Sequence, residues 1–513
     1  MPSSRYWCVL AAVLAATLIS TPAHAQESGE HGALVWDGTS AQPCLGCHRN
    51  EALEVHGSAH YQWEGAAPYN LDGGALQGKK KTAFNSYCVN ITGNFGACGN
   101  CHVGRGAFPD ASAGDAQLQN IDCLVCHQAG YKRKKVSGVF VADTANMTIT
   151  PTQAVQTVHR PTRATCLQCH AKGGGGDNFK RGDLALAHAT TSDRSFDVHM
   201  ATSGANLNCT ACHTNSQHRI AGRGSDLRQT DLDAPMNCSN GSCHVGKASG
   251  GHGNADLDKH VNRVACQTCH VGPVSARNAR DTSATEATEV FRDWSAPPHL
   301  VGTQYHPETT LANNIKPAYR FWNKYSNNYS FGEVAVLDAT TGAYPTSRTA
   351  GAITDTATTT KLYPFKYKTA RQPYAYGKNV LVALDTSVFF SGAGLPAATQ
   401  QGLVNMGYSS TEPTELVTTD TYQLLTHEIA PKDSALKCEQ CHGSTATQMN
   451  LRSLGYVLKA SESTVCSQCH KRRANPGWKD IHSKHVQEHR YDCSTCHSFT
   501  RPELGLRIRR TRG

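Results

Sequence analysis

The chain has 513 residues, which is enough for roughly three or four ordinary domains. Charged residues make up 17% of it, below the about 25% of typical globular chains and far below the charge of a disordered chain. Aromatic residues are only 7%, too few for one large core built of side chains alone. The 22 cysteines and 26 histidines therefore indicate that bound groups fill part of the interior.

Residues 1–25 are predicted to form a secretory signal peptide. Arg5 precedes an apolar run from Trp7 to Ile19, and Ala23-His24-Ala25 matches a signal-cleavage site. The run is too short to cross a bilayer, and no later segment is long and apolar enough to do so. We therefore expect an exported protein, periplasmic or on the outer cell surface, that does not itself span a membrane.

Beyond the signal, 21 cysteines remain, and 20 of them form ten motifs in which histidine directly follows the second cysteine. Nine are C-x-x-C-H, and the sixth has four residues between its cysteines. In chain order, the first to tenth motifs are Cys44/Cys47/His48, Cys98/Cys101/His102, Cys123/Cys126/His127, Cys166/Cys169/His170, Cys209/Cys212/His213, Cys238/Cys243/His244, Cys266/Cys269/His270, Cys438/Cys441/His442, Cys466/Cys469/His470 and Cys493/Cys496/His497. Cys88 is left over, and we expect a buried thiol there in preference to an unusual linkage.

The motif predicts covalently bound c-type haem. Its two thiols add to the haem vinyl groups, and the following imidazole binds the iron. A single copy could instead be a zinc knuckle or a redox dithiol, and a disulfide framework would not need the histidine. Ten copies in an exported chain favour ten c-type haems, each with iron.

Each iron has a second axial position, and histidines outside the motifs are numerous enough to fill it. The mature chain has only five methionines, so we expect mainly bis-histidine haems. Several of these histidines precede a motif closely, as His159 does 7 residues before Cys166. The candidates for the second ligand are His56, His60, His159, His188, His199, His218, His252, His260, His427, His482, His485 and His489. His31, His299 and His306 are the histidines expected to be spare.

Motif spacing predicts the organisation of the chain. We expect a seven-haem cytochrome domain over 26–270, a haem-free, partly β insert over 271–437 and a three-haem C-terminal domain over 438–513. The fold class is predicted to be mainly α and irregular, with packed haems as its core. Within the insert, the apolar segment 380–390 is β-prone. The insert either joins the two haem groups as a scaffold or walls a substrate pocket.

Basic segments occur at 79–81, 132–135 and 507–512, and the formal charge of the chain is +9. Ten ferric haems with their propionates would add about −10, which brings the loaded protein near neutrality. We therefore expect these basic residues to pair with propionates or to dock a redox partner, and we expect no nucleic acid.

Three segments carry a resemblance to a known family. They are Asp197-Val-His-Met200 before the fifth motif, Tyr363-Pro-Phe-Lys366 with Gln372-Pro-Tyr374, and 427–436 before the eighth motif. These segments resemble the octahaem tetrathionate reductase family, which is related to hydroxylamine-oxidising and nitrite-reducing multihaem enzymes. That family carries its active-site haem on C-x-x-C-K, whereas all ten motifs here end in histidine. The resemblance implies shared ancestry and haem packing more than shared catalysis.

Two functions follow as alternatives, and no residue is predicted to be catalytic. The first is electron transfer along closely packed haems in anaerobic or extracellular respiration. Its partners would be a membrane quinol-oxidising cytochrome and other periplasmic or outer-membrane cytochromes, and self-association into a filament is a variant of it. The second is a multihaem oxidoreductase that acts on a small nitrogen or sulfur oxyanion at one open haem, beside acid–base groups such as His, Lys or Tyr.

Overall fold

A computed structural model describes most of the chain after the predicted signal peptide. The described residues are 28–71, 76–87, 95, 99–226, 229–241, 243–248, 251–280, 287–352, 355, 359–442, 446–451, 454, 456–459, 462–467, 481–489, 491 and 495–499. The signal peptide predicted over 1–25, Cys88, Cys98, Cys469, His470 and Cys493 lie outside them. In the described residues, no helix is long and apolar enough to cross a membrane.

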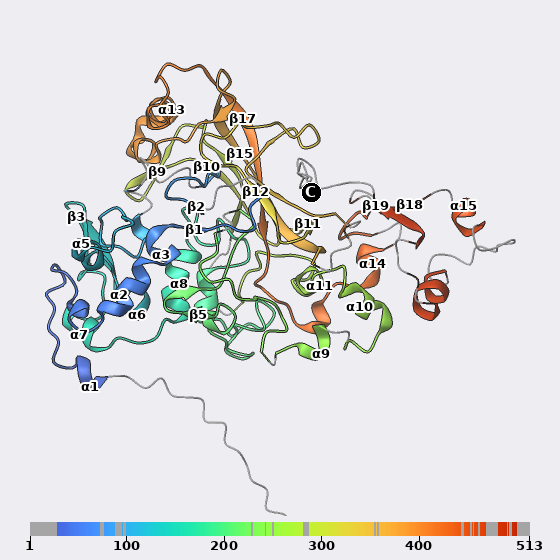
Figure 1. Ribbon diagram of the computed structural model, residues 1–513, viewed down its shortest axis with the longest axis horizontal. Helices are drawn as coiled ribbons and strands as arrows, with labels where there is room; N and C mark the ends of the chain where they lie inside the picture. The colour runs from blue at the N-terminus through green and yellow to red at the C-terminus, as the bar shows by residue number, and fades with distance from the viewer. Residues whose placement is uncertain are drawn as a thin grey trace, which may run out of the picture.

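The first half of the chain folds into short helical turns joined by loops and small two-stranded ribbons (Figure 1). Its elements are α1 (Ser28–His31), η1 (Pro43–Gly46), α2 (Arg49–His56), α3 (Ala59–Gln62), β1 (Glu64–Ala66), β2 (Leu76–Gly78), η2 (Gly99–Cys101), α5 (Asp115–Gln119), α6 (Leu124–His127), β3 (Arg133–Val136), β4 (Val139–Ala142), α7 (Pro151–Gln156), α8 (Arg163–His170), η3 (Leu186–Ala189), η4 (Cys209–Ala211), β5 (Asn215–Ser216), β6 (Arg219–Ile220), α9 (Val245–Ala248), α10 (Ala255–His260) and α11 (Cys266–His270).

A seven-stranded sheet forms the upper part of the molecule in Figure 1, with strand order β10-β7-β15-β17-β13 and with β11 and β16 paired to β15. The elements of this region are β7 (Thr288–Asp293), β8 (His299–Val301), β9 (Gln304–His306), β10 (Glu308–Ala312), β11 (Ala318–Trp322), β12 (Ser326–Asn328), β13 (Tyr344–Pro345), β14 (Ser347–Thr349), β15 (Lys361–Ala375), β16 (Val380–Leu381), α12 (Thr386–Val388), η5 (Phe389–Ala393), α13 (Gly394–Asn405) and β17 (Thr414–Leu424).

The sheet is organised around β15, whose 15 residues are mostly buried. It pairs antiparallel with β17 in an unbroken register from Phe365↔Leu424 to Ala375↔Thr414. Its other edge pairs parallel with β7 and antiparallel with β11. The aromatic residues of the insert pack on this frame, where Trp294, Phe365 and Phe389 have no exposed surface. The sheet therefore has a side-chain core of its own.

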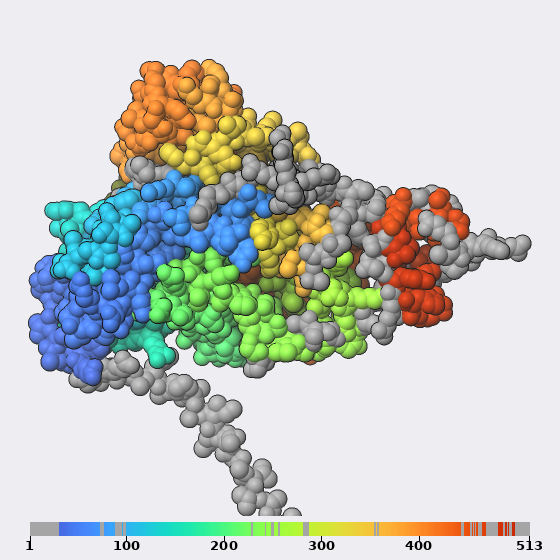
Figure 2. Space-filling model, viewed as in Figure 1, coloured from blue at the N-terminus to red at the C-terminus, as the bar shows by residue number. Residues whose placement is uncertain are grey.

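The C-terminal segment lies at the right of the molecule in the space-filling view (Figure 2). Its elements are η6 (Lys432–Ser434), α14 (Cys438–Cys441), β18 (Tyr456–Leu458), α15 (Glu462–Ser467), η7 (Ser483–Glu488) and β19 (His497–Phe499). The chain returns from the sheet at β17, and the eighth motif begins on α14, close to α11 of the seventh motif (Figure 1).

Two expectations need correction. The fold is mixed α/β and not mainly α, because a large sheet and several two-stranded ribbons accompany helices that are mostly one or two turns long. The β-prone segment 380–390 is a strand only over Val380–Leu381. Asp385 then accepts hydrogen bonds from the backbone N–H groups of Ser387 and Val388, which caps a helical turn and ends the extended run.

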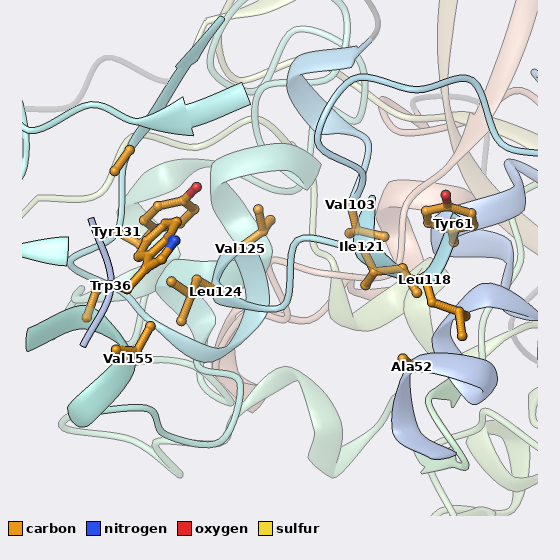
Figure 3. Packing of buried hydrophobic residues seen from close by; sticks show 12 residues of the cluster. Trp36, Ala52, Tyr61, Val103, Leu118, Ile121, Leu124, Val125, Tyr131 and Val155 are labelled. Carbon is orange, nitrogen blue, oxygen red and sulfur yellow. The ribbon is translucent and has the colours of Figure 1, made fainter. Parts of the chain in front are cut away.

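The motif-bearing half has an apolar cluster of its own. Figure 3 shows Trp36, Tyr131 and Val155 together at one end of it and Tyr61 and Leu118 at the other. Between these groups, Leu124 and Val125 of α6 belong to the third motif. The side-chain core of this half thus runs through a motif, and Cys123 and Cys126 of that motif pack against it.

Candidate functional site

Several motifs lie on short helices. Those of α6 and α8 end at the motif histidine, and α11 and α14 begin at the first motif cysteine. Residues three and four apart share a face of a helix, so the two thiols and the imidazole project from one side of the turn. Thr162 fixes the start of α8 through a reciprocal capping box with Thr165, which places the fourth motif in its last turn.

These turns surround a single cavity of about 3910 Å³. The motif residues that line it are Cys44, Cys47, His48, Cys101, Cys123, Cys126, His127, Cys166, Cys169, His170, Cys209, Cys212, His213, Cys238, Cys243 and His244. The first to sixth motifs thus face one common space, although the chain between the outermost of them is 200 residues long.

The described cysteines and histidines of the seventh to tenth motifs do not line this cavity, although Gln267 of the seventh motif does. Their described cysteines are Cys266 and Cys269 on α11, Cys438 and Cys441 on α14, Cys466 on α15, and Cys496 directly before β19. Cys496 is half-buried, and its backbone oxygen accepts a hydrogen bond from the backbone N–H of Lys459 at 3.0 Å. That bond joins the tenth motif to the end of β18. The structure therefore does not bring Cys466 or Cys496 into the space that the first six motifs share, and haem attachment at these two thiols stays a prediction.

Thiols of different motifs meet in pairs. The Cys44 thiol lies near that of Cys123, Cys101 near Cys169, Cys166 near Cys209, and Cys238 near Cys266. Electrostatic interactions between thiols link the third motif to the fourth, the fifth to the sixth, and the seventh to the eighth. His442 of the eighth motif is in turn near His497 of the tenth. Among the described residues, all motifs except the ninth are thus linked in a row, with the second motif attached at the fourth.

The histidine rings form a second set of pairs. In the described part of the chain, seven motif histidines each have one non-motif histidine ring 5.9–6.4 Å away, centre to centre. The pairs are His48/His31, His170/His60, His127/His218, His244/His199, His213/His427, His442/His260 and His497/His482. Two imidazoles that bind one metal from opposite sides, each with a bond of about 2.0 Å, have ring centres about 6.2 Å apart. The spacing fits one iron between the rings of each pair.

The ring planes divide the pairs into two groups. The planes of His48/His31, His213/His427 and His497/His482 are near parallel, at 16°, 19° and 24°. The other four pairs are closer to perpendicular, at 61–79°. Burial lowers the pKa of the His170 imidazole to about 3 and that of His442 to about 4, so both rings are neutral and able to bind metal.

Of the predicted second ligands, six are in these pairs: His60, His199, His218, His260, His427 and His482. His31, which the sequence placed among the spare histidines, is in the same relation to His48 as they are to their partners. It was overlooked because it lies near the start of the mature chain, 13 residues before Cys44.

The remaining candidates are placed differently. His252 interacts electrostatically with His270 of the seventh motif. Both ring nitrogens of His159 are hydrogen-bonded to backbone groups, which does not support the axial role predicted for it. His56 packs on Tyr61, and His188 is fully buried against Phe196. His485 and His489 are near each other on the last turns, and His299 faces His306 across the β8–β9 hairpin.

His102 of the second motif is an exception among the described motif histidines. It is buried, its Nε2–H donates to the backbone oxygen of Tyr61 at 2.5 Å, and its Nδ1 accepts from Gly104. Burial lowers its pKa to about 4. It does not line the cavity, although Cys101 does, and no second histidine ring pairs with it in the described residues. Both nitrogens of this imidazole are thus already engaged.

Basic side chains line the cavity where the fifth and sixth motifs approach the sheet. Arg223 lies over the ring of Tyr69, at 3.7 Å, and one of its terminal nitrogens is buried without a hydrogen bond. Lys324 lies over the rings of Trp322 and Tyr363. Burial and the nearby Arg223 lower the pKa of Lys324 to about 8. These cations are suited to carboxylates such as haem propionates.

The chain has similarities to known proteins. The family described as "Cytochrome c bacterial" matches residues 305–445. A solved structure, the octaheme cytochrome c from Shewanella oneidensis, aligns with a TM-score of 0.67 and 26% identity over 84% of this chain and 96% of that one. An uncharacterized protein from Archaeoglobus fulgidus is 28% identical over 245 residues, which cover 38% of this chain and 80% of the relative.

Proposed function

We propose that this multihaem c-type cytochrome carries electrons along a row of ten haems, one at each motif. The seven histidine pairs carry this proposal, because each joins a motif imidazole to a second imidazole at the spacing of a bis-histidine iron. When bound, c-type haem iron gains and loses one electron at a time. An iron with two protein ligands has no open position for a substrate, which favours electron transfer over catalysis.

The residues of the chain would hold this row in several ways. Motif thiols fix each haem covalently, and paired imidazoles close the iron from both sides. The thiol contacts, such as those of Cys166 with Cys209 and of Cys238 with Cys266, keep successive motifs next to each other. Arg223 and Lys324 would bind propionates of the haems at the fifth and sixth motifs. The hydrogen bonds of Nδ1 leave Nε2 of rings such as His213 and His127 for the iron.

Export to the periplasm or the outer cell surface, with other cytochromes as donor and acceptor, is the setting that a row of haems requires. Its ends at the first and tenth motifs are where partners would exchange electrons with it. A role in anaerobic or extracellular respiration follows from that setting. The resemblance to the octahaem tetrathionate reductase family extends the proposal to a common haem arrangement and not to a common substrate.

A second function is favoured by one observation, the engagement of His102. If that imidazole keeps its hydrogen bond to Tyr61, the haem at the second motif lacks the usual ligand and has an open iron. The cavity there is lined by Tyr87, Lys172 and Arg292, and Arg292 comes from the insert at 5.1 Å from the Tyr87 ring. A cavity lined by these residues suits a small nitrogen or sulfur oxyanion. The open haem at the second motif would then receive its electrons from the haem at the fourth motif.

Electron paramagnetic resonance of the oxidised, fully loaded protein separates the two functions. Low-spin signals alone, unchanged by nitrite or hydroxylamine, are expected for electron transfer. A stoichiometric high-spin signal that nitrite or hydroxylamine alters, and that is absent in Cys98→Ser/Cys101→Ser, would establish an open haem at the second motif. Cys44→Ser/Cys47→Ser is the matched control, since it removes one haem from the other end of the row.

A further inference from the structure

The axial histidines differ in what accepts the hydrogen bond of Nδ1. His127 and His213 donate to backbone oxygens, of His159 at 3.0 Å and of Ala221 at 2.9 Å. His427, the partner of His213, donates instead to the carboxylate of Asp183 at 3.2 Å. His218, the partner of His127, donates to Glu54 at 2.7 Å. In each of the pairs His213/His427 and His127/His218, one imidazole thus donates to a neutral backbone oxygen and the other to a carboxylate.

Asp183 and Glu54 are in different surroundings. The Asp183 side chain is fully buried, and the same oxygen that faces His427 accepts from the backbone N–H groups of Thr426, at 2.7 Å, and His427, at 2.9 Å. Nε of Arg181 lies 3.5 Å from its other oxygen. The side chains of His218 and Glu54 are 33% and 32% exposed. Asp183 is therefore a fixed charge in a medium of low dielectric constant, and Glu54 is hydrated.

A carboxylate that accepts the Nδ1 hydrogen bond makes the imidazole a more basic ligand. Its negative charge also favours the more positive oxidation state of the metal, and this effect is larger where water is excluded. Both effects stabilise ferric over ferrous iron. At the neighbouring fourth and sixth motifs, none of His60, His170, His199 and His244 has a ring nitrogen hydrogen-bonded to a carboxylate within the described residues.

We infer that Asp183 is a positioning residue that gives the fifth motif a lower reduction potential than the motifs on either side of it. This rests on the proposed function, since it takes His213 and His427 as the two ligands of one iron. The ferric iron gains one electron from the adjacent haem and passes one to the next, and Asp183 keeps its charge throughout. The fifth motif is then the most strongly reducing point in the middle of the row.

The test uses the loaded full-length protein in an EPR-monitored redox titration. His427→Gly first identifies the signal, because loss of an axial ligand should remove one low-spin signal and add a high-spin one. Asp183→Asn keeps the side-chain shape and the backbone hydrogen bonds and removes the charge. We expect that same signal to remain low-spin and its potential to rise by about 59 mV, which corresponds to a tenfold loss of ferric preference.

Two further variants complete the design. Glu54→Gln is the matched control: its signal belongs to another haem, and solvent should keep its shift well below that of Asp183→Asn. Arg181→Gln should lower the reduction potential of the fifth-motif signal, because it removes a cation. This variant tests the inference if the Asp183→Asn protein does not incorporate haem.

The inference would be overturned if Asp183→Asn shifts the potential no more than Glu54→Gln does. It would also be overturned if the fifth-motif potential in Arg181→Gln is unchanged or higher. Neither result would contradict the histidine pair. Unchanged low-spin signals in His427→Gly would instead overturn the pair and with it the proposed row at this point.

Discussion

The sheet region and the motif-bearing half obtain their interiors in different ways. In the sheet, Trp294, Phe365 and Phe389 fill the space between strands and helices, as in an ordinary domain. In the other half, a cavity of about 3910 Å³ has motif thiols and imidazoles in its lining. Protein interiors are close-packed, so a space of this size is completed by a bound group. We therefore expect the sheet region to be stable through its side chains, and the motif-bearing half to need its cofactors in addition to its own apolar cluster.

The boundary between the regions is polar. Lys368 of β15 forms an ion pair with Glu289 of β7 at 2.7 Å and donates to Ser86 from the motif-bearing half. Lys366, two residues before it, donates to Tyr87 and to backbone oxygens of Phe179 and Lys180. Burial holds the pKa of Lys366 well below its usual range. Fully buried lysines of this kind fix the sheet against the motifs through directed hydrogen bonds.

The largest effect should come from removing a haem at the centre of the row. We expect Cys166→Ser/Cys169→Ser to lose one haem and to loosen the structure over 99–270, because its thiols contact the second, third and fifth motifs. Haem content by pyridine haemochrome and limited proteolysis measure this, with a fragment over 288–424 expected to persist. The end-of-row variant Cys44→Ser/Cys47→Ser should be cleaved less. Equal protease resistance of the fourth-motif variant and the unmodified protein would contradict the comparison.

Removing a side chain from the sheet core should have the next largest effect, a loss of stability of the sheet. Trp294→Ala should cost about 3–5 kcal/mol of the free energy of unfolding of the sheet, through a cavity and a lost hydrogen bond to the backbone oxygen of Ser86. Guanidinium titration followed by circular dichroism measures it. Tyr376, 53% exposed beyond the end of β15, is the matched control, and Tyr376→Ala should change stability by less than about 0.5 kcal/mol. Similar costs for both variants would refute a separate sheet core.

A smaller, local effect is expected from the ring-plane groups. Parallel imidazole planes split the iron d orbitals more than perpendicular ones, so the oxidised protein should show both a rhombic and a highly anisotropic class of low-spin signal. Replacing His31 with glycine should reduce only the rhombic class, and His60→Gly only the anisotropic class. A single signal class in the unmodified protein would contradict the two groups.

The smallest effect concerns the surface. Arg49 and Asp115 form an ion pair at 2.7 Å with side chains 55% and 73% exposed. Such pairs contribute between about 0 and 1 kcal/mol, so Arg49→Gln should leave the denaturation midpoint nearly unchanged and the haem potentials unaltered. A large loss of stability would mean that α2 and α5 depend on this contact more than on the buried side chains between them.

The motif residues could be located from the sequence more easily than the fold could be predicted from it. Each motif carries its chemistry within five adjacent residues, or seven in the sixth motif, so each could be identified without knowing any distant contact. The second ligands depend on contacts such as that of His427 with His213, separated by more than 200 residues, and no local pattern distinguishes His31 from a spare histidine. The sheet was predicted only as a partly β insert, because β15 is buried on both faces and shows no alternation of apolar and polar residues.

The contacts of the fourth motif affect how electrons would move through the molecule. Among the described motifs, it alone touches three others, so the row is a branched network with one junction and three ends. In the proposed row, electrons that enter at any end would reach the other two only through this junction. The redox state of the haem at the fourth motif would therefore limit how many electrons can pass along two branches at once. A reaction at the second motif would compete for these electrons with a partner at the tenth motif.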